Sequence, residues 1–286
     1  GFIIMGMYKT SPDIDFLVIK TDALGNIQWS SGYGSSSNDW GNSCLILPGG
    51  GYLIAGTTYG FGAGMHNGML IKIDNTGTML WSKTYGGNND EGFIALTQCT
   101  DGGFLMADAT ISFGFTKDNV YVVKTDSSGN LLWAKGYGEN GKDLRTFSVV
   151  NTADSGYAFA VYNESASFAD FSVLKIDSIG NLDWVNQFGG TLEDYSSSII
   201  NGIGGGYALT GWTKSFGSGN NDIYMIKTDS LGRTQNCNEI ISNITGTFIT
   251  PTVDSVSPTQ SVISLISSVP ALLEVAVLLP VTTLCL

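Results

Sequence analysis

The feature that most constrains the fold of this chain is an internal repeat of about 52 residues. Its clearest marker is a tryptophan that recurs at intervals of 52, 52 and 51 residues, at Trp29, Trp81, Trp133 and Trp184. A Lys-x-Asp triplet precedes each tryptophan, and a fifth triplet at residues 227–229 follows without one. A regular period of this length indicates that one supersecondary unit is stacked several times.

Each repeat contains four candidate strands. The first begins with a Gly-aromatic pair such as Gly103-Phe104, and the second is the apolar run that ends in Lys-x-Asp. The third carries the tryptophan, and the fourth is a weaker run such as residues 93–98. Four short strands per unit predict a β-propeller blade. We predict an all-β propeller of about five four-stranded blades, or a fragment of a larger ring, because strands three and four occur only four times.

The turn between the second and third strands has a physical basis in its sequence. The segment at residues 126–130, Asp-Ser-Ser-Gly-Asn, places an aspartate that accepts backbone hydrogen bonds before a glycine that tolerates positive φ. The tryptophan that follows supplies apolar area for packing one blade on the next. We therefore assign structural roles to the repeated tryptophans and to five aspartates, Asp22, Asp74, Asp126, Asp177 and Asp229.

These motifs resemble the repeats of secreted bacterial β-propeller proteins of the Bacteroidetes type. Those units read Lys-Thr-Asp-x-x-Gly-Asn-x-x-Trp, with Tyr-Gly-Gly and Asp-Gly-Gly-Tyr farther on, and residues 124–133, 85–87 and 101–104 match them. The resemblance covers residues 1 to about 233. It implies a propeller fold and an extracellular or cell-surface location, and it is uninformative about activity because such repeats occur in proteins of many roles.

The chain changes character after the last turn, so we divide it into propeller repeats (1–233) and an apolar, β-rich tail (234–286). Pro270, Glu274 and Pro280 interrupt the tail well short of the roughly 20 apolar residues that a membrane helix needs. We therefore predict short strands and no transmembrane helix. Such strands can pack on the chain's own propeller, complete a blade or extend a sheet of a neighbouring copy, and a cleaved or mobile tail is a further alternative.

Four cysteines allow three complete disulfide pairings. Cys237 and Cys285 bracket the tail, and the resemblance favours their pairing because secreted proteins with this repeat carry a similar frame. Cys44 and Cys99 occupy non-equivalent places in neighbouring repeats, so we expect buried thiols, with a disulfide as the alternative.

Composition narrows the possible functions. The formal net charge is −12 and the chain contains two arginines, Arg145 and Arg233, which argues against binding a phosphate backbone and hence nucleic acid. Charged residues make up only 13% of the chain, which is compatible with secretion or a place on the cell surface. The first residues already match the inside of a repeat, so we expect a mature or fragmentary chain whose blade number the sequence leaves open.

The sequence contains no pattern typical of catalysis. Residues present in every repeat are explained by the blade, whereas a catalytic site normally uses residues that break the symmetry. The single histidine, His66, lies in a glycine-rich loop, and no nucleophile motif accompanies it. Two arginines are too few for the cluster that a sialidase uses to bind its substrate. We predict a non-enzymatic protein without a cofactor.

Two kinds of residue remain as binding candidates. Trp40 and Trp212 lie outside the repeat position, and an exposed tryptophan can stack on a sugar ring or anchor a protein, although core filling also explains them. Acidic residues recur after the aromatic-Gly pairs, where turn formation is the commoner role. Weak candidates for calcium ligands are Asp39, Asp90, Glu91 and Asp194.

Together these features predict a non-catalytic extracellular or cell-surface protein with a structural or interaction role. The incomplete fifth unit and the strand-rich tail favour self-assembly into a filament or surface array, with further copies of the chain or other surface proteins as partners. The alternative is a glycan- or ligand-binding propeller module that uses Trp40 or Trp212. A hydrolase is the third hypothesis, and the single histidine argues against it.

Overall fold

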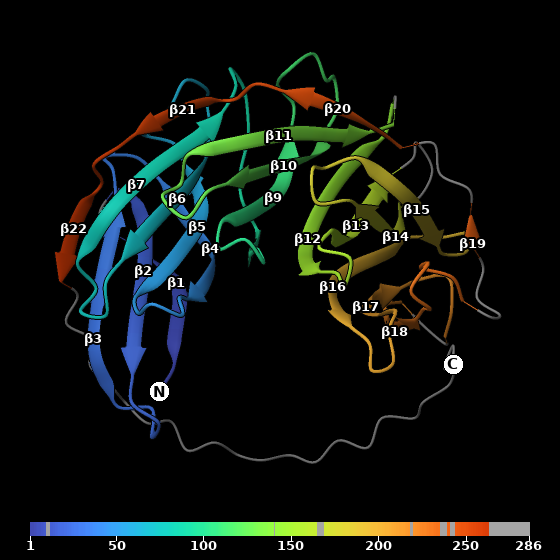
Figure 1. Cartoon of the computed structure of the whole chain (residues 1–286), viewed down its shortest axis with the longest axis horizontal. Coiled ribbons are helices and arrows are strands. Elements are labelled where there is room, and N and C mark those ends of the chain that lie inside the picture. The colour runs from blue at the N-terminus through green and yellow to red at the C-terminus, as the bar shows by residue number, and fades with distance from the viewer. Residues whose placement is uncertain are drawn as a thin grey trace.

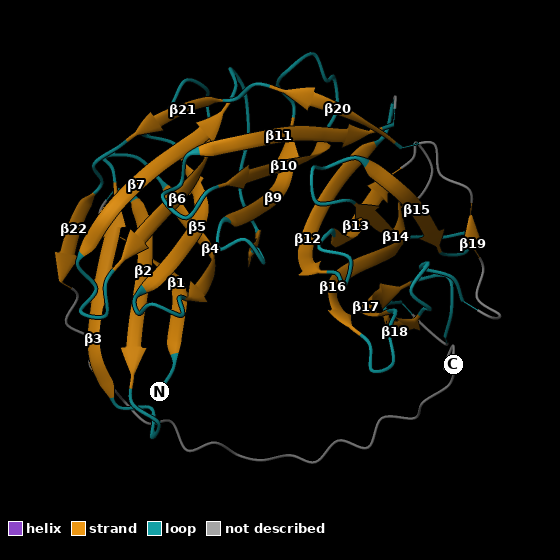
Figure 2. Cartoon of the chain, viewed as in Figure 1, coloured by secondary structure: helices purple, strands orange, loops and turns teal. Residues whose placement is uncertain are grey.

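The described part of the chain consists of β-strands and connecting loops (Figure 2). The computed structural model describes residues 1–9, 12–139, 141–164, 169–217, 220–234, 239–240 and 244–262. Within them the strands form five antiparallel sheets, which we number I to V in chain order. The prediction of an all-β repeat architecture is confirmed.

The five sheets contain three to five strands each. Sheet I contains β1 (Ile3–Lys9), β2 (Ile14–Thr21), β3 (Ile27–Gly34) and β22 (Thr259–Val262). Sheet II contains β4 (Asp39–Ile46), β5 (Tyr52–Thr58), β6 (Asn67–Ile73), β7 (Met79–Gly86) and β21 (Thr252–Ser255). Sheet III contains β8 (Ala95–Gln98), β9 (Phe104–Thr110), β10 (Asn119–Thr125), β11 (Leu131–Gly138) and β20 (Thr245–Ile249). Sheet IV contains β12 (Asp143–Asn151), β13 (Tyr157–Glu164), β14 (Ala169–Ile176), β15 (Leu182–Phe188) and β19 (Glu239–Ile240), and sheet V contains β16 (Asp194–Asn201), β17 (Tyr207–Thr213) and β18 (Asp222–Lys227).

The sheets follow one another along an open arc, with sheet I at one end and sheet V at the other (Figure 1). Strands β4, β12 and β16 lie toward its concave side, and β20, β21 and β22 follow its convex side. Consecutive sheets pack through four apolar cores. Within the described ranges no strand of sheet I makes an extended contact with sheet V, so the arc stays open.

The central strands are apolar throughout because both of their faces are covered. In β10 every side chain is buried, and alternate residues point to opposite faces. Val120 and Val122 pack toward sheet IV, whereas Tyr121 and Val123 pack toward sheet II. Each sheet thus has a leading face, toward the next sheet in chain order, and a trailing face, toward the preceding one.

The repeated turn and the repeated tryptophan form one packing unit across each junction. The Asp126 carboxylate accepts hydrogen bonds from the N–H groups of Ser128 and Asn130, each at 2.8 Å, and Gly129 has a φ of 74°. A methyl group at Gly129 would lie 2.9 Å from the ring of Trp81, so sheet II packs closely on the turn of sheet III. The same close approach joins Trp29 to Gly77, Trp133 to Gly180 and Trp184 to Gly232.

A tyrosine hydroxyl adds a buried hydrogen bond at three of the four junctions. Tyr85 donates to the carbonyl of Gly129 at 2.6 Å and Tyr137 to that of Gly180 at 2.7 Å, and Tyr33 donates in the same way to Gly77. Phe188 occupies the equivalent position of sheet IV, and it has no hydroxyl to donate to sheet V. The last junction therefore lacks this bond.

The described part of the tail runs back along the outer edges of the sheets in reverse order (Figure 1). Strands β19, β20, β21 and β22 pair antiparallel with β15, β11, β7 and β3 of the same chain. Side chains also hold it in place, since the Gln260 amide donates to the Gly77 carbonyl at 2.8 Å and Lys135 lies 3.8 Å from the centre of the Phe248 ring. Among the described residues, sheet V contains no tail strand and β18 is its last strand.

Candidate interaction surfaces

No other sheet of the described chain packs on the leading face of sheet V. Ile223 and Met225 of β18 are 75% and 51% exposed, and Ile200 of β16 is exposed as well. Met225 lies two residues before the repeated lysine, and its equivalents in the other four sheets are all 0% exposed, namely Val18, Leu70, Val122 and Val173. The position that closes every other junction therefore faces solvent at this end of the arc.

The trailing face of sheet I is uncovered in the same way. Phe2 and Ile4 of this face are 59% and 47% exposed. Phe2 follows the first glycine of its repeat, and its equivalents are at most 5% exposed, namely Tyr52, Phe104, Tyr157 and Tyr207. A side chain at Gly25, in the turn of sheet I, would meet nothing within 4 Å, whereas every later turn glycine lies against a tryptophan.

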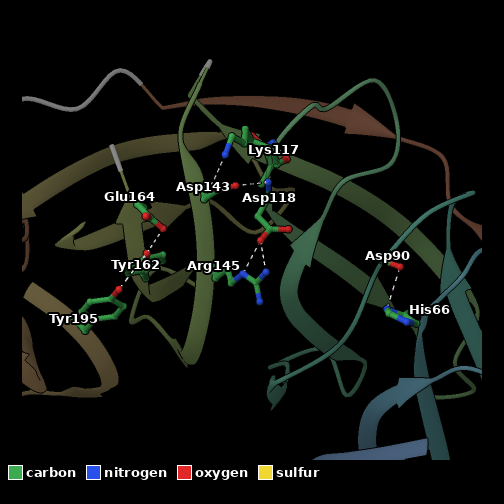
Figure 3. Close-up of polar contacts among 10 residues, drawn as sticks. His66, Asp90, Lys117, Asp118, Asp143, Arg145, Tyr162, Glu164 and Tyr195 are labelled. Atoms are coloured by element: carbon green, nitrogen blue, oxygen red, sulfur yellow. Dashed lines mark hydrogen bonds and ion pairs between the residues drawn. The ribbon is translucent and has the colours of Figure 1, made fainter. Parts of the chain in front are cut away.

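Trp212, a predicted binding residue, lies at the edge of the open face of sheet V. It is the register partner of Ile223, and it is half-buried because its ring stacks on Tyr195 with a centroid separation of 4.1 Å. Tyr195 stacks in turn on Tyr162 of sheet IV at 4.5 Å (Figure 3). The Tyr162 hydroxyl bonds to Glu164. This three-ring stack joins sheets IV and V beside the uncovered face.

Trp40, the other predicted binding residue, lies on β4 and is 38% exposed. Its ring meets the Tyr59 ring edge-on, with the two centroids 4.9 Å apart. The centroids of the Tyr59 and His66 rings are 3.7 Å apart. His66 in turn contacts Asp90 at 3.0 Å (Figure 3). The histidine is therefore part of a contact between the β5–β6 loop and the loop from β7 to β8, and Asp90, one of the calcium candidates, is its partner.

The other three calcium candidates are buried and hold the loops that lead into β4, β8 and β16. Glu91 accepts hydrogen bonds from the Gly87 N–H at 2.6 Å and the Thr110 hydroxyl at 2.7 Å. Asp194 bonds in the same pattern to Gly190 and Thr213, and Asp39 to Ser35. Burial raises the pKa of Asp39. Among the residues that the structure describes, no group of three or more His, Cys, Asp or Glu residues is placed to hold a metal ion.

A charged cluster that the sequence reasoning missed lies where sheets III and IV meet (Figure 3). Arg145 donates from Nε to Asp118 at 2.6 Å, and Lys117 donates to Asp143 at 2.9 Å. Burial raises the pKa of Asp108 to about 7. The positive charge of Arg145 opposes this rise, and the negative charge of Asp118 adds to it. A signal was present in the sequence, since Asp108 stands where three other repeats have glycine, at Gly6, Gly56 and Gly211.

The cysteines fall into two groups. Cys44 and Cys99 are free thiols, half-buried and buried respectively, and burial raises the pKa of both. Cys237 and Cys285, which we predicted to form a disulfide, lie outside the described residues.

Comparison with known proteins adds no family to these observations. No protein-family model matches the chain, and no curated protein matches it either. The resemblance to secreted propeller repeats therefore stays a prediction from motifs. Within the described ranges, no helix is long and apolar enough to cross a membrane.

Proposed function

We propose that this chain is an open β-propeller-type scaffold that acts as a non-catalytic structural or interaction protein, outside the cell or at its surface, and associates with further copies of itself. The observation that carries the proposal is the exposure of Phe2 and Ile4 at one end of the arc and of Ile223 and Met225 at the other. Exposed apolar patches on a folded domain commonly mark interaction sites.

A second copy is the partner that these two faces fit best. The leading face of sheet V presents the repeat positions that pack on trailing faces at the four interior junctions, and the trailing face of sheet I presents the complementary positions. Packing sheet V of one copy on sheet I of the next would continue the same stacking. Because the two faces differ, the contact is head-to-tail and extends into a filament or a closed ring.

The charge of the chain adds a specific expectation. Each copy carries a formal net charge of −12, so copies repel one another at low ionic strength. Salt screens this repulsion, with a Debye length of about 10 Å at 0.1 M and about 3 Å at 1 M. Association through apolar faces should therefore strengthen as salt is added, the reverse of the behaviour of a contact based on ion pairs.

The non-catalytic part of the proposal is supported by the structural roles of the repeated polar residues. Asp126 and its equivalents bind turn backbone, the tyrosine hydroxyls bond to turn carbonyls, and Glu91 and Asp194 hold loops. The extracellular location rests on the low proportion of charged residues and on the motif resemblance.

The test combines light scattering over a range of protein and salt concentrations with electron microscopy. Met225→Asp and Ile4→Asp each place a charge on one open face, and either change should dissolve the assemblies. Leu80→Asp is the matched control, because Leu80 is also exposed but lies away from both ends. A wild-type chain that stays monomeric at every concentration, or assemblies that survive both face variants, would overturn the proposal.

A further inference from the structure

A groove of about 760 Å³ lies between sheets IV and V, at the rim formed by the strand-connecting turns. Residues of the turn at 151–154 and of the turn at 201–206 line the groove, together with Trp184 and Tyr207. The volume is in the range of about 300–1,000 Å³ that is typical of small-molecule sites. Because sheet V ends at β18, no further strand of the described chain flanks the groove on that side.

One lining residue breaks the repeat. The residue before the repeated tryptophan is Gln28, Leu80 or Leu132 in sheets I to III, and it is Asp183 in sheet IV. The Asp183 carboxylate lies 2.9 Å from Nζ of Lys175, which also contacts Asp154 at 2.9 Å. The groove thus combines two carboxylates with one ammonium group, and Asp183 distinguishes it from the other junctions.

The charges in the groove are held in place. The Lys175 side chain is buried, and its ammonium group donates to both carboxylates and to the Ile176 carbonyl at 2.9 Å. Burial raises the pKa of Asp154, but hydrogen bonds from Thr152 and Lys175 outweigh it and lower that pKa to about 2. Both carboxylates remain partly exposed, so each can accept further hydrogen bonds from a ligand.

These features select the chemistry of a ligand. An anion would be repelled by two carboxylates, since the ammonium hydrogens are already used by Asp154, Asp183 and the backbone. The buried Lys175 ammonium offsets one of the two carboxylate charges, so the groove attracts a cation less than a bare pair of carboxylates would. A neutral molecule with hydroxyl donors on one side and a C–H face on the other fits both the carboxylates and the half-buried ring of Trp184. The Tyr207 ring is buried, and its centroid lies 6.0 Å from that of Trp184.

We propose that this groove binds a neutral saccharide, with Asp154 and Asp183 accepting hydrogen bonds from sugar hydroxyls and the half-buried Trp184 ring packing on the sugar ring. The proposal is independent of self-association, because the groove lies at the junction between sheets IV and V and the open face lies on the other side of sheet V.

The test is calorimetric titration of the full chain with a panel of neutral oligosaccharides built from glucose, galactose, mannose and N-acetylglucosamine. Asp183→Leu installs the residue found in sheets II and III, and it should weaken binding at least tenfold with an unchanged melting temperature. Asp154→Asn should weaken binding as well. Gln28→Leu installs the same residue at the equivalent position of sheet I, and binding should stay unchanged.

Three results would overturn the saccharide site: no binding of any sugar at millimolar concentration, wild-type affinity in Asp183→Leu, or an equal loss in Gln28→Leu. Met225→Asp separates the two proposals, because a variant that no longer assembles should still bind the same sugar.

Discussion

At the junction between sheets III and IV, Val122 is fully buried, whereas Met225, at the same repeat position in sheet V, is 51% exposed. The two residues follow the same pattern of the repeat, and both are apolar. Their burial differs only because a neighbouring sheet covers one and not the other. The comparison of interior junctions with open ends thus shows that the ends retain a sequence suited to stacking, which is the basis of the proposed self-association.

The largest difference in stability is expected between variants that place an aspartate at Val122 and at Met225, its equivalent in sheet V. Val122→Asp buries a charge with no partner and should cost about 3–5 kcal/mol, or prevent folding. Met225→Asp should change the free energy of unfolding of the isolated chain by less than about 1 kcal/mol. Urea denaturation at low protein concentration measures both. Equal losses would show that the face of sheet V is covered in the folded monomer.

An aromatic truncation gives a second contrast. Phe104→Ala removes a fully buried ring from the core between sheets II and III and should cost about 3–5 kcal/mol. Phe2→Ala truncates the equivalent exposed ring and should cost less than about 1 kcal/mol. The midpoints of thermal unfolding test this pair, and a large effect of Phe2→Ala would place that ring in a core.

The third prediction concerns the pH dependence of stability that the Asp108 carboxyl group produces. Burial raises the pKa of Asp108 to about 7, above its value of about 4 in the unfolded chain. The stability that this group contributes is therefore present below about pH 4 and is lost as the pH rises through about 7. The loss is at most about 4 kcal/mol. Asp108→Asn should flatten this part of the pH profile of the unfolding free energy, and an unchanged profile would contradict the shift.

The smallest contrast sets an interior junction against the last one. Tyr137→Phe removes the buried hydrogen bond to Gly180 and should cost about 1 kcal/mol. Phe188→Tyr places a hydroxyl at the equivalent position facing the turn of sheet V, and it should stabilise the chain by a similar amount if Gly232 accepts the bond as its counterparts do. Denaturation midpoints of the two variants should move in opposite directions, and a shift in the same direction would show that the last junction is packed differently.

Some residues of the candidate surfaces stood out in the sequence, whereas the contacts that give them a role did not. Trp212 stood out because it breaks the repeat, yet its place beside Ile223 at an open face depends on how sheet V packs. Asp183 also breaks the repeat, but its proposed role as a ligand-binding residue depends on its contact with Lys175 and on the groove between two sheets. Asp108 and Arg145 are 37 residues apart in the sequence, and no local pattern connects them.

The sequence by itself determined the main strands, the turns and the length of the repeat, because these depend on local properties. Alternating side chains fix which residues share a face, Asp126 and Gly129 fix the turn, and the spacing of the tryptophans fixes the unit. Only the tertiary structure decided that the described part of the tail pairs in reverse order with the outer edges of four sheets and that apolar side chains on two sheet faces are exposed. Burial depends on which distant segment lies opposite, and a repeated sequence carries the same apolar residues whether or not a neighbouring sheet covers them.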